Sequence, residues 1–231
     1  MTTIASNLQA VRDAIAAAAT GADRQANEIS LLAVSKTFAP DALRKACLAG
    51  QTRFAESYAQ EALDKMAALQ DLPIEWHYIG PIQSNKTRAI AENFSWVHSV
   101  DRLKIAERLS EQRPAHLPPL QVCLQVNISM EASKSGVAPD EAGALARAIA
   151  KLPGLKLRGL MAVPAPSDNV VAQRLPFAQL RKLRDQLNQQ GLQLDTLSMG
   201  MSHDFAAAIA EGATMVRIGT AIFGDRNYGD K

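Results

Sequence analysis

The chain has 231 residues, of which 47% are hydrophobic and 21% charged, and this composition is typical of a globular protein. Its 25 basic and 23 acidic residues give a formal net charge of +2 without any dense basic run, so nothing indicates nucleic-acid binding. No apolar run approaches the roughly 18 residues of a transmembrane helix, which argues against a membrane protein. Cys47 and Cys123 lie far apart in the sequence and lack metal-ligand spacing, so we expect free thiols in a cytoplasmic protein.

The first twenty residues predict an amphipathic helix rather than a signal peptide. They lack a basic start, and Arg12 and Asp13 interrupt the apolar stretch. The apolar residues with helical spacing are Ile4, Leu8, Val11 and Ile15.

Eight short apolar runs follow, and each predicts a β-strand. They cover residues 31–36, 53–56, 76–80, 96–100, 121–128, 157–163, 196–200 and 215–219. Longer stretches with helical spacing lie between them, at 40–50, 57–70, 101–112 and 139–154. Asp101 is predicted to be the N-cap of the third of these helices.

The regular alternation of strand and helix predicts parallel strands joined by crossover helices. Either a closed (β/α)8 barrel or an open doubly wound sheet satisfies this pattern. Eight units favour the barrel, and the glycine-rich fingerprint of a dinucleotide-binding sheet is missing after the strand at 31–36. We therefore expect an α/β protein with one (β/α)8 domain over residues 1–231, whose extra N-terminal helix caps the bottom or an edge of the barrel.

The end of the first strand carries a lysine, Lys36, which is unusual after an apolar run. Strand alternation places Lys36 on the same side as Leu32 and Val34, facing the barrel interior. Active sites of such barrels lie at the C-terminal ends of the strands. Lys36 is therefore a candidate amine nucleophile, a buried ion-pair partner, or a lysine that extends out of the barrel mouth.

The ends of the last two strands resemble a phosphate site. Gly219 and Thr220 follow the eighth strand, and Ser202 follows the glycine that ends the seventh, in each case before a possible helix. Glycine lets an anion approach backbone N–H groups closely, and hydroxyls donate hydrogen bonds to it. Arg217 should point into the barrel, either in a structural ion pair or against a ligand.

The histidines show no zinc-ligand spacing, so a metal site is not expected. His77 and His98 lie near strand ends, where we expect them to pack in the core or at the rim. Tyr58 and Tyr78 also lie near strand ends; alternation predicts that Tyr78 faces the helices and that Tyr58 opens one.

Several long motifs resemble the pyridoxal phosphate homeostasis proteins, often called the YggS or PROSC family. They are LLAVSKT, WHYIGPIQSNK, NISMEASKSG, RGLMAVPAP, LSMGMSHDF and MVRIGTAIFG, and the resemblance extends from about residue 3 to about residue 228. It implies a (β/α)8 barrel of the alanine racemase N-terminal domain type. It also implies that Lys36 binds pyridoxal 5′-phosphate as a Schiff base, that Ser202, Gly219 and Thr220 bind its phosphate, and that Arg217 reaches its pyridine nitrogen.

Two positions depart from the family pattern. Ser57 stands where the family usually has asparagine near the cofactor, so a shorter hydroxyl replaces an amide at this expected contact. His203 stands where many members have an acidic residue, which changes the charge beside the phosphate loop.

The resemblance implies a carrier or buffer of pyridoxal phosphate, and not an enzyme. Such a protein would act as a monomer, would meet cofactor-requiring apoenzymes transiently and would bind neither nucleic acid nor membranes. The alternative is a pyridoxal-phosphate-dependent racemase or decarboxylase, whose relatives generally carry a second β-domain for which the chain leaves no room after the barrel. A cofactor-free Schiff-base aldolase would need the lysine but not Arg217 or the phosphate loops.

Overall fold

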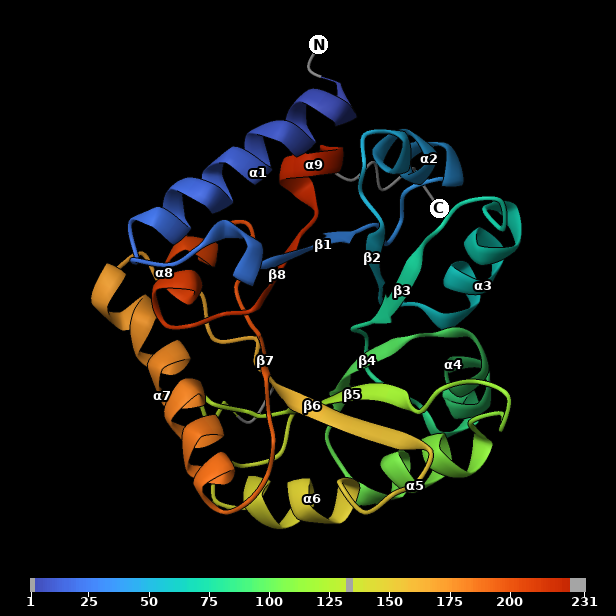
Figure 1. The fold of residues 1–231 in the computed structure, drawn as a ribbon, viewed down its shortest axis with the longest axis vertical. Helices are drawn as coiled ribbons and strands as arrows, with labels where there is room; N and C mark the ends of the chain where they lie inside the picture. The colour runs from blue at the N-terminus through green and yellow to red at the C-terminus, as the bar shows by residue number, and fades with distance from the viewer. Residues whose placement is uncertain (1–2, 132–134, 225–231) are drawn as a thin grey trace.

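The protein is a closed barrel of eight parallel strands, described by a computed structural model over residues 3–131 and 135–224 (Figure 1). Each strand pairs with the next in the chain, and β8 closes the ring by pairing with β1. The strands are β1 (Ser30–Val34), β2 (Arg53–Glu56), β3 (Glu75–Tyr78), β4 (Trp96–Val100), β5 (Leu120–Gln125), β6 (Leu155–Met161), β7 (Thr196–Ser198) and β8 (Met215–Ile218). The predicted (β/α)8 barrel is thus confirmed.

Helices surround the barrel and connect its strands. Across the described residues they are α1 (Ile4–Thr20), α2 (Pro40–Leu48), α3 (Ala59–Ala68), α4 (Thr87–Asn93), α5 (Leu103–Gln112), α6 (Ala142–Ile149), α7 (Val170–Gln189), α8 (Phe205–Ala210) and α9 (Thr220–Phe223), with short 3-10 turns η1 (Ala26–Glu28) and η2 (Ser84–Lys86). Pro40 opens α2, where its fixed φ suits a first helical turn.

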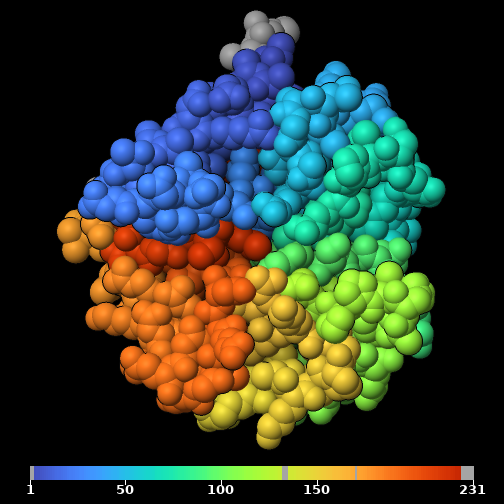
Figure 2. All heavy atoms as spheres, viewed as in Figure 1, coloured from blue at the N-terminus to red at the C-terminus, as the bar shows by residue number. Residues whose placement is uncertain are grey.

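The extra N-terminal helix, α1, was predicted at the bottom or at an edge of the barrel, and it lies at the side, in the outer helical layer. It packs against α2, α8 and α9 through its apolar face, and the space-filling view shows it directly beside the C-terminal segments (Figures 1 and 2). The Asn7 amide donates to the Ile222 carbonyl at 3.0 Å, and Arg12 donates to the Ala49 carbonyl. The helix therefore holds the first and last βα units together.

Element boundaries differ from the sequence prediction at two informative places. Strand β1 ends at Val34, so Lys36 lies in the loop beyond the strand rather than at its end. Asp101 is not the N-cap of α5, because the extended backbone of Arg102 delays the first helical turn and Arg102 takes the cap position. Asp101 instead lies near the Arg102 guanidinium, at 3.7 Å.

Two apolar cores result from the alternation of side chains along the strands. The larger fills the space between strands and helices, and Tyr78 packs edge-on against Phe94 there, facing the helices as predicted. The smaller lies inside the barrel and consists of Leu32, Val34, Ala55, Trp96, Cys123, Met161 and Met215. Leu32 and Val34 thus point inward, as the pattern before Lys36 predicted.

Two features are absent from residues 3–131 and 135–224. None of the helices there is both long and apolar enough to cross a membrane. The same part of the chain holds no cluster of three or more His, Cys, Asp or Glu side chains suited to a metal ion.

Candidate functional site

A cavity of about 300 Å³ lies at the C-terminal ends of the strands, and it brings together all six candidate residues of the sequence. They come from four strands or the loops that follow them: Lys36 after β1, Ser57 after β2, Ser202 after β7, Arg217 on β8, and Gly219 and Thr220 after β8. Val34, Ile79 and Met161 supply apolar walls. The volume lies at the lower end of the range for small-molecule sites.

The loop that carries Lys36 has a strained backbone. Thr37 has a φ of 72°, in the left-handed region that non-glycine residues rarely adopt. Such strain persists only where the surrounding structure enforces it. The Lys36 side chain is half-buried and lines the cavity.

A buried lysine on α3, Lys65, fixes the residues on both sides of Lys36. Its ammonium donates to the Ser35 carbonyl at 2.7 Å, to Glu56 at 2.8 Å and to Glu61 at 2.5 Å. Glu56 in turn accepts from the Ser35 hydroxyl at 2.6 Å, and Glu61 accepts from the Thr37 N–H. We call Ser35, Glu56, Glu61 and Lys65 the α3 clamp.

The clamp carries an unusual charge arrangement for a barrel wall. Glu56 is fully buried, and burial raises the pKa of its carboxyl group against the opposing effects of Lys65 and the Ser35 hydroxyl. Its second oxygen, Oε2, has no hydrogen-bond partner among the described residues. The negative charge on Glu56 therefore depends on Lys65, whose side chain is only 4% exposed.

The loops after β7 and β8 form the polar end of the cavity. A Cβ atom at Gly219 would lie 2.9 Å from the Val34 carbonyl oxygen, so glycine allows the β8 loop to pass close to the end of β1. Thr220, the first residue of α9, is exposed. Because α9 has only four residues, we assign this end of the site to hydroxyls and local N–H groups rather than to a helix dipole.

Ser202 lies in the turn before α8 and is not its N-cap. Asp204 takes the cap position, and its carboxylate accepts from the Met201 N–H at 2.5 Å. The Ser202 side chain is therefore not needed to cap the helix and lines the cavity instead.

Arg217 is buried at the inner wall of the cavity, with 4% of the residue exposed. One terminal nitrogen donates to the Ser198 carbonyl and hydroxyl at 2.5 and 2.8 Å, and the other donates to the Ala162 carbonyl at 2.8 Å. These bonds use three of the five N–H groups of a guanidinium. Burial lowers the pKa of Arg217 to about 10, so the side chain stays charged at neutral pH.

The two residues that depart from the expected motif both line the cavity. Ser57 is half-buried, and its carbonyl accepts a bond from the Tyr78 hydroxyl. The tight packing of Gly80 against the Ser57 backbone fixes this loop, since a Cβ at Gly80 would lie 2.1 Å from the Ser57 oxygen. His203 is exposed at the rim.

Sequence reasoning missed the α3 clamp. Its only local signals are the i, i+4 spacing of Glu61 and Lys65 and the acidic residue that ends the second strand. The spacing of Glu61 and Lys65 is common on solvated helix faces, and an acidic residue at a strand end does not identify its partner. Only the closed fold brings Lys65 beneath the Lys36 loop.

Known proteins are similar to this chain over nearly its whole length. Residues 6–227 match the family model described as alanine racemase, N-terminal domain. The chain is 62% identical over 229 residues to a pyridoxal phosphate homeostasis protein of Pseudomonas aeruginosa, covering 99% of this chain and 98% of that protein. It is 54% identical over 234 residues to the protein of the same name from Escherichia coli K12, with complete coverage of both chains.

Solved structures are also similar over nearly the whole chain. The structure of PipY from Synechococcus elongatus with PLP bound has a TM-score of 0.84 and 37% identity to this chain, covering 96% of this chain and 100% of PipY. The structure of PipY without PLP has a TM-score of 0.86 at 38% identity, with the same coverage.

Proposed function

Because the chain belongs to the family of pyridoxal phosphate homeostasis proteins, we propose that it binds pyridoxal 5′-phosphate as a Schiff base on Lys36 and serves as a carrier of this cofactor. The observation that carries the proposal is the composition of one cavity, which is lined by a lysine, three hydroxyl side chains and a buried guanidinium. PipY, a relative of the same fold, has been seen with PLP bound.

The residues present fit three polar parts of the cofactor, its phosphate, its pyridine nitrogen and its aldehyde. Ser202, Thr220 and the close approach allowed by Gly219 suit a phosphate. Arg217 keeps two N–H groups beyond its bonds within the described residues, and these suit the pyridine nitrogen, which accepts hydrogen bonds when unprotonated. Lys36 supplies the amine that the aldehyde requires.

When bound, the cofactor supplies an aldehyde for reversible attachment and an aromatic ring that can withdraw electrons. Attachment to Lys36 forms one C=N bond and releases one water molecule, and hydrolysis reverses the step. The α3 clamp orients Lys36 through its neighbours Ser35 and Thr37. Apolar walls of Val34, Ile79 and Met161 keep water from the ring faces.

Arg217 at the inner wall of the cavity supports a carrier role. A strong electron sink needs a protonated pyridine nitrogen, usually held by a carboxylate. A charged arginine donates to that nitrogen and leaves it without a proton. Neither Tyr58, exposed at the start of α3, nor Tyr78, whose hydroxyl binds the Ser57 and Pro81 carbonyls, lines the cavity as an acid or base.

The proposed function also concerns the location, the oligomeric state and the partners of the protein. It acts as a cytoplasmic monomer of one domain and passes the cofactor to apoenzymes that bind it transiently. The near-neutral net charge of +2 supports the absence of a nucleic-acid partner. The lack of a membrane-spanning helix among the described residues is consistent with this setting.

The carrier role predicts no efficient chemistry at the α-carbon of amino acids. We expect negligible exchange of the α-proton when the loaded protein is incubated with a panel of amino acids in heavy water and followed by NMR. Exchange on the order of 1 per second or faster, lost in Lys36→Ala, would instead establish the alternative, a racemase or decarboxylase.

Removal of the hydroxyls at the polar end should strongly reduce the preference for the phosphorylated cofactor. Ser202→Ala and Thr220→Val are each expected to weaken binding of pyridoxal phosphate by about 1–3 kcal/mol, the effect of losing a hydrogen bond to a charged group. Binding of unphosphorylated pyridoxal should not change. Absorbance titration of the wild type, both variants and their double variant with each ligand measures this preference.

Thr52→Val provides the matched control, because Thr52 is an exposed threonine at the opposite end of the strands. Its affinities should equal those of the wild type. A double variant that still strongly prefers the phosphorylated ligand contradicts the phosphate assignment, and a wild type that binds neither ligand contradicts the proposed function.

A further inference from the structure

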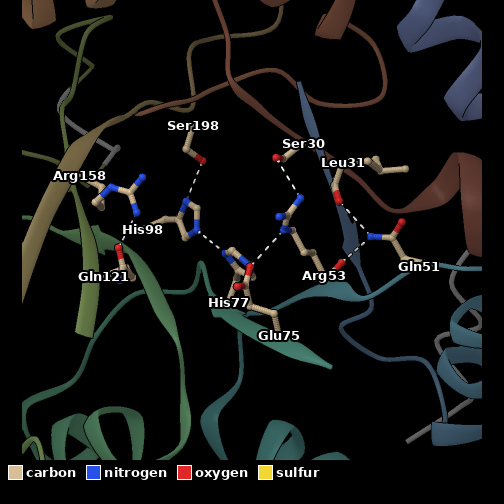
Figure 3. A network of polar contacts seen from close by, with 10 residues as sticks. All are labelled: Ser30, Leu31, Gln51, Arg53, Glu75, His77, His98, Gln121, Arg158 and Ser198. Carbon is tan, nitrogen blue, oxygen red and sulfur yellow. Dashed lines mark hydrogen bonds and ion pairs between the residues drawn. The ribbon is translucent and has the colours of Figure 1, made fainter. Parts of the chain in front are cut away.

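Four polar side chains form a continuous hydrogen-bonded column inside the barrel (Figure 3). Glu75 Oε1 lies 2.8 Å from His77 Nε2, His77 Nδ1 lies 2.9 Å from His98 Nε2, and His98 Nδ1 lies 2.8 Å from Ser198 Oγ. His77, His98 and Ser198 are completely buried. We call Glu75, His77, His98 and Ser198 the interior column.

The column connects the two ends of the barrel. At its upper end the Ser198 hydroxyl accepts from Arg217, which lines the site cavity. At its lower end the Glu75 side chain is 39% exposed and pairs with Arg53 at 3.2 Å. Arg53 also donates to Ser30, and both line a cavity of about 390 Å³ at the N-terminal ends of the strands (Figure 3). A buried cation on one side is thus linked to a half-exposed carboxylate on the other.

The hydrogen bonds of the interior column all run in one direction, because each member after Glu75 donates toward it and accepts from the neighbour on the Ser198 side. The Glu75 carboxylate can only accept, so His77 carries a proton on Nε2, and a neutral His77 then accepts on Nδ1. His98 must then donate from Nε2 and accept on Nδ1, and its donor is the Ser198 hydroxyl. Ser198 in turn accepts from Arg217. Every contact is satisfied with both histidines neutral and in the same tautomer.

The surroundings favour neutral histidines. Burial lowers the pKa of His77, against the effect of Glu75, and burial together with His77 and Arg217 lowers the pKa of His98 well below its usual value. Cys123 faces the same interior as a neutral thiol, because burial raises its pKa to about 12. The remaining charges near the lower end, Arg158 and Asp195, form their own ion pair.

We propose that the interior column positions Arg217 for the cofactor, by giving the Ser198 hydroxyl a fixed direction that is set at the far end of the barrel by Glu75. The glutamate, both histidines and the serine are thus positioning residues for the site. The identity of the cofactor that Arg217 contacts rests on the proposed function, whereas the direction of the hydrogen bonds in the column does not.

Glu75→Gln tests the direction without altering the cavity. A glutamine amide can donate to His77 Nε2 as well as accept from it, so the column can then form in either direction. In the reversed column both histidines carry the proton on Nδ1, and Ser198 Oγ receives donors from His98 and Arg217 at once. Because Glu75 is half-exposed, the substitution should leave the fold intact.

The experiment combines nitrogen NMR of labelled histidines with cofactor titration. His116→Gln removes one exposed histidine from the spectra, and the signals of His203, which lines the cavity, are assigned with a His203→Gln sample used for NMR alone. Without ligand, His77 and His98 should both be neutral Nε2–H tautomers, and Glu75→Gln should raise the share of the Nδ1–H form at both. Affinity for pyridoxal phosphate should fall about threefold in Glu75→Gln and about tenfold in Ser198→Ala.

Thr196→Val is the matched control, because it removes another buried hydroxyl from β7 that bonds to Asp195 outside the column. It should change neither the tautomers nor the affinity. A charged or Nδ1–H histidine in the wild type overturns the proposed direction. Full cofactor affinity in folded Glu75→Gln and Ser198→Ala overturns the positioning role, whereas a wild type that binds no pyridoxal phosphate overturns the proposed function and leaves the tautomer result to decide the direction.

Discussion

Replacement of Lys36 with alanine is expected to abolish covalent retention of pyridoxal phosphate completely. The cavity would keep Ser202, Thr220 and Arg217, so weaker binding anchored by the phosphate should remain. The wild-type protein should be yellow, and borohydride should reduce the C=N bond and fix the ligand. Peptide mapping of the reduced protein locates the adduct, and dialysis before reduction separates covalent from reversible binding.

Lys86→Ala is the control, since Lys86 belongs to a family-like motif but does not line the cavity. The Lys86→Ala protein should stay yellow and should form the reduced adduct on Lys36. A reduced adduct on Lys86, or on Lys134, which lies outside the described residues, would contradict the assignment of Lys36. Retention of the reducible bond in Lys36→Ala would contradict it equally.

Lys65→Met should destabilise the fold by about 3–5 kcal/mol, the range for breaking a buried ion pair from one side. The substitution leaves the Glu56 carboxylate buried, with Ser35 as its remaining partner in the α3 clamp. It also removes the bond to the Ser35 carbonyl, so the Lys36 loop should loosen and cofactor affinity should fall. Urea unfolding measures the first effect and absorbance titration the second.

The double variant Lys65→Met with Glu56→Gln separates charge burial from packing. It should recover much of the lost stability, because a neutral amide no longer needs a buried cation. Lys45→Met, on the exposed face of α2, should change stability by no more than about 0.5 kcal/mol. A Lys65→Met protein as stable as the wild type would mean that Glu56 is already neutral in the folded protein.

The barrel could be predicted because its signals are local and repeated. Each apolar run followed by an amphipathic stretch specifies one βα unit, and alternation before Lys36 places Leu32 and Val34 inside. The rule that sites lie at the C-terminal ends of barrel strands then selected Lys36, Ser202, Arg217, Gly219 and Thr220. The family resemblance added Ser57, and the structure brings all six residues into one cavity.

The side-chain contacts between distant strands and helices could not be predicted from these local signals. His77 and His98 were expected to pack in the core or at the rim, and both are buried. Their cross-barrel contacts could not be predicted, because they depend on how the ring closes and on the offset between distant strands. His98 and Ser198, which form one of these contacts, are 100 residues apart in the sequence. Lys65 has the spacing of a surface helix residue, and only tertiary packing places it under the Lys36 loop.

The exposed rim of the cavity has a kinetic consequence. Thr220 and His203 are exposed and Lys36 is half-buried, so solvent reaches the mouth without any rearrangement of the barrel. For a carrier, residence time would then depend on hydrolysis of a single covalent bond and on the sum of polar contacts, and not on the opening of a gate. Tight binding and rapid release are then compatible, because affinity depends on the contacts within the cavity, whereas release depends on the solvent exposure of its mouth.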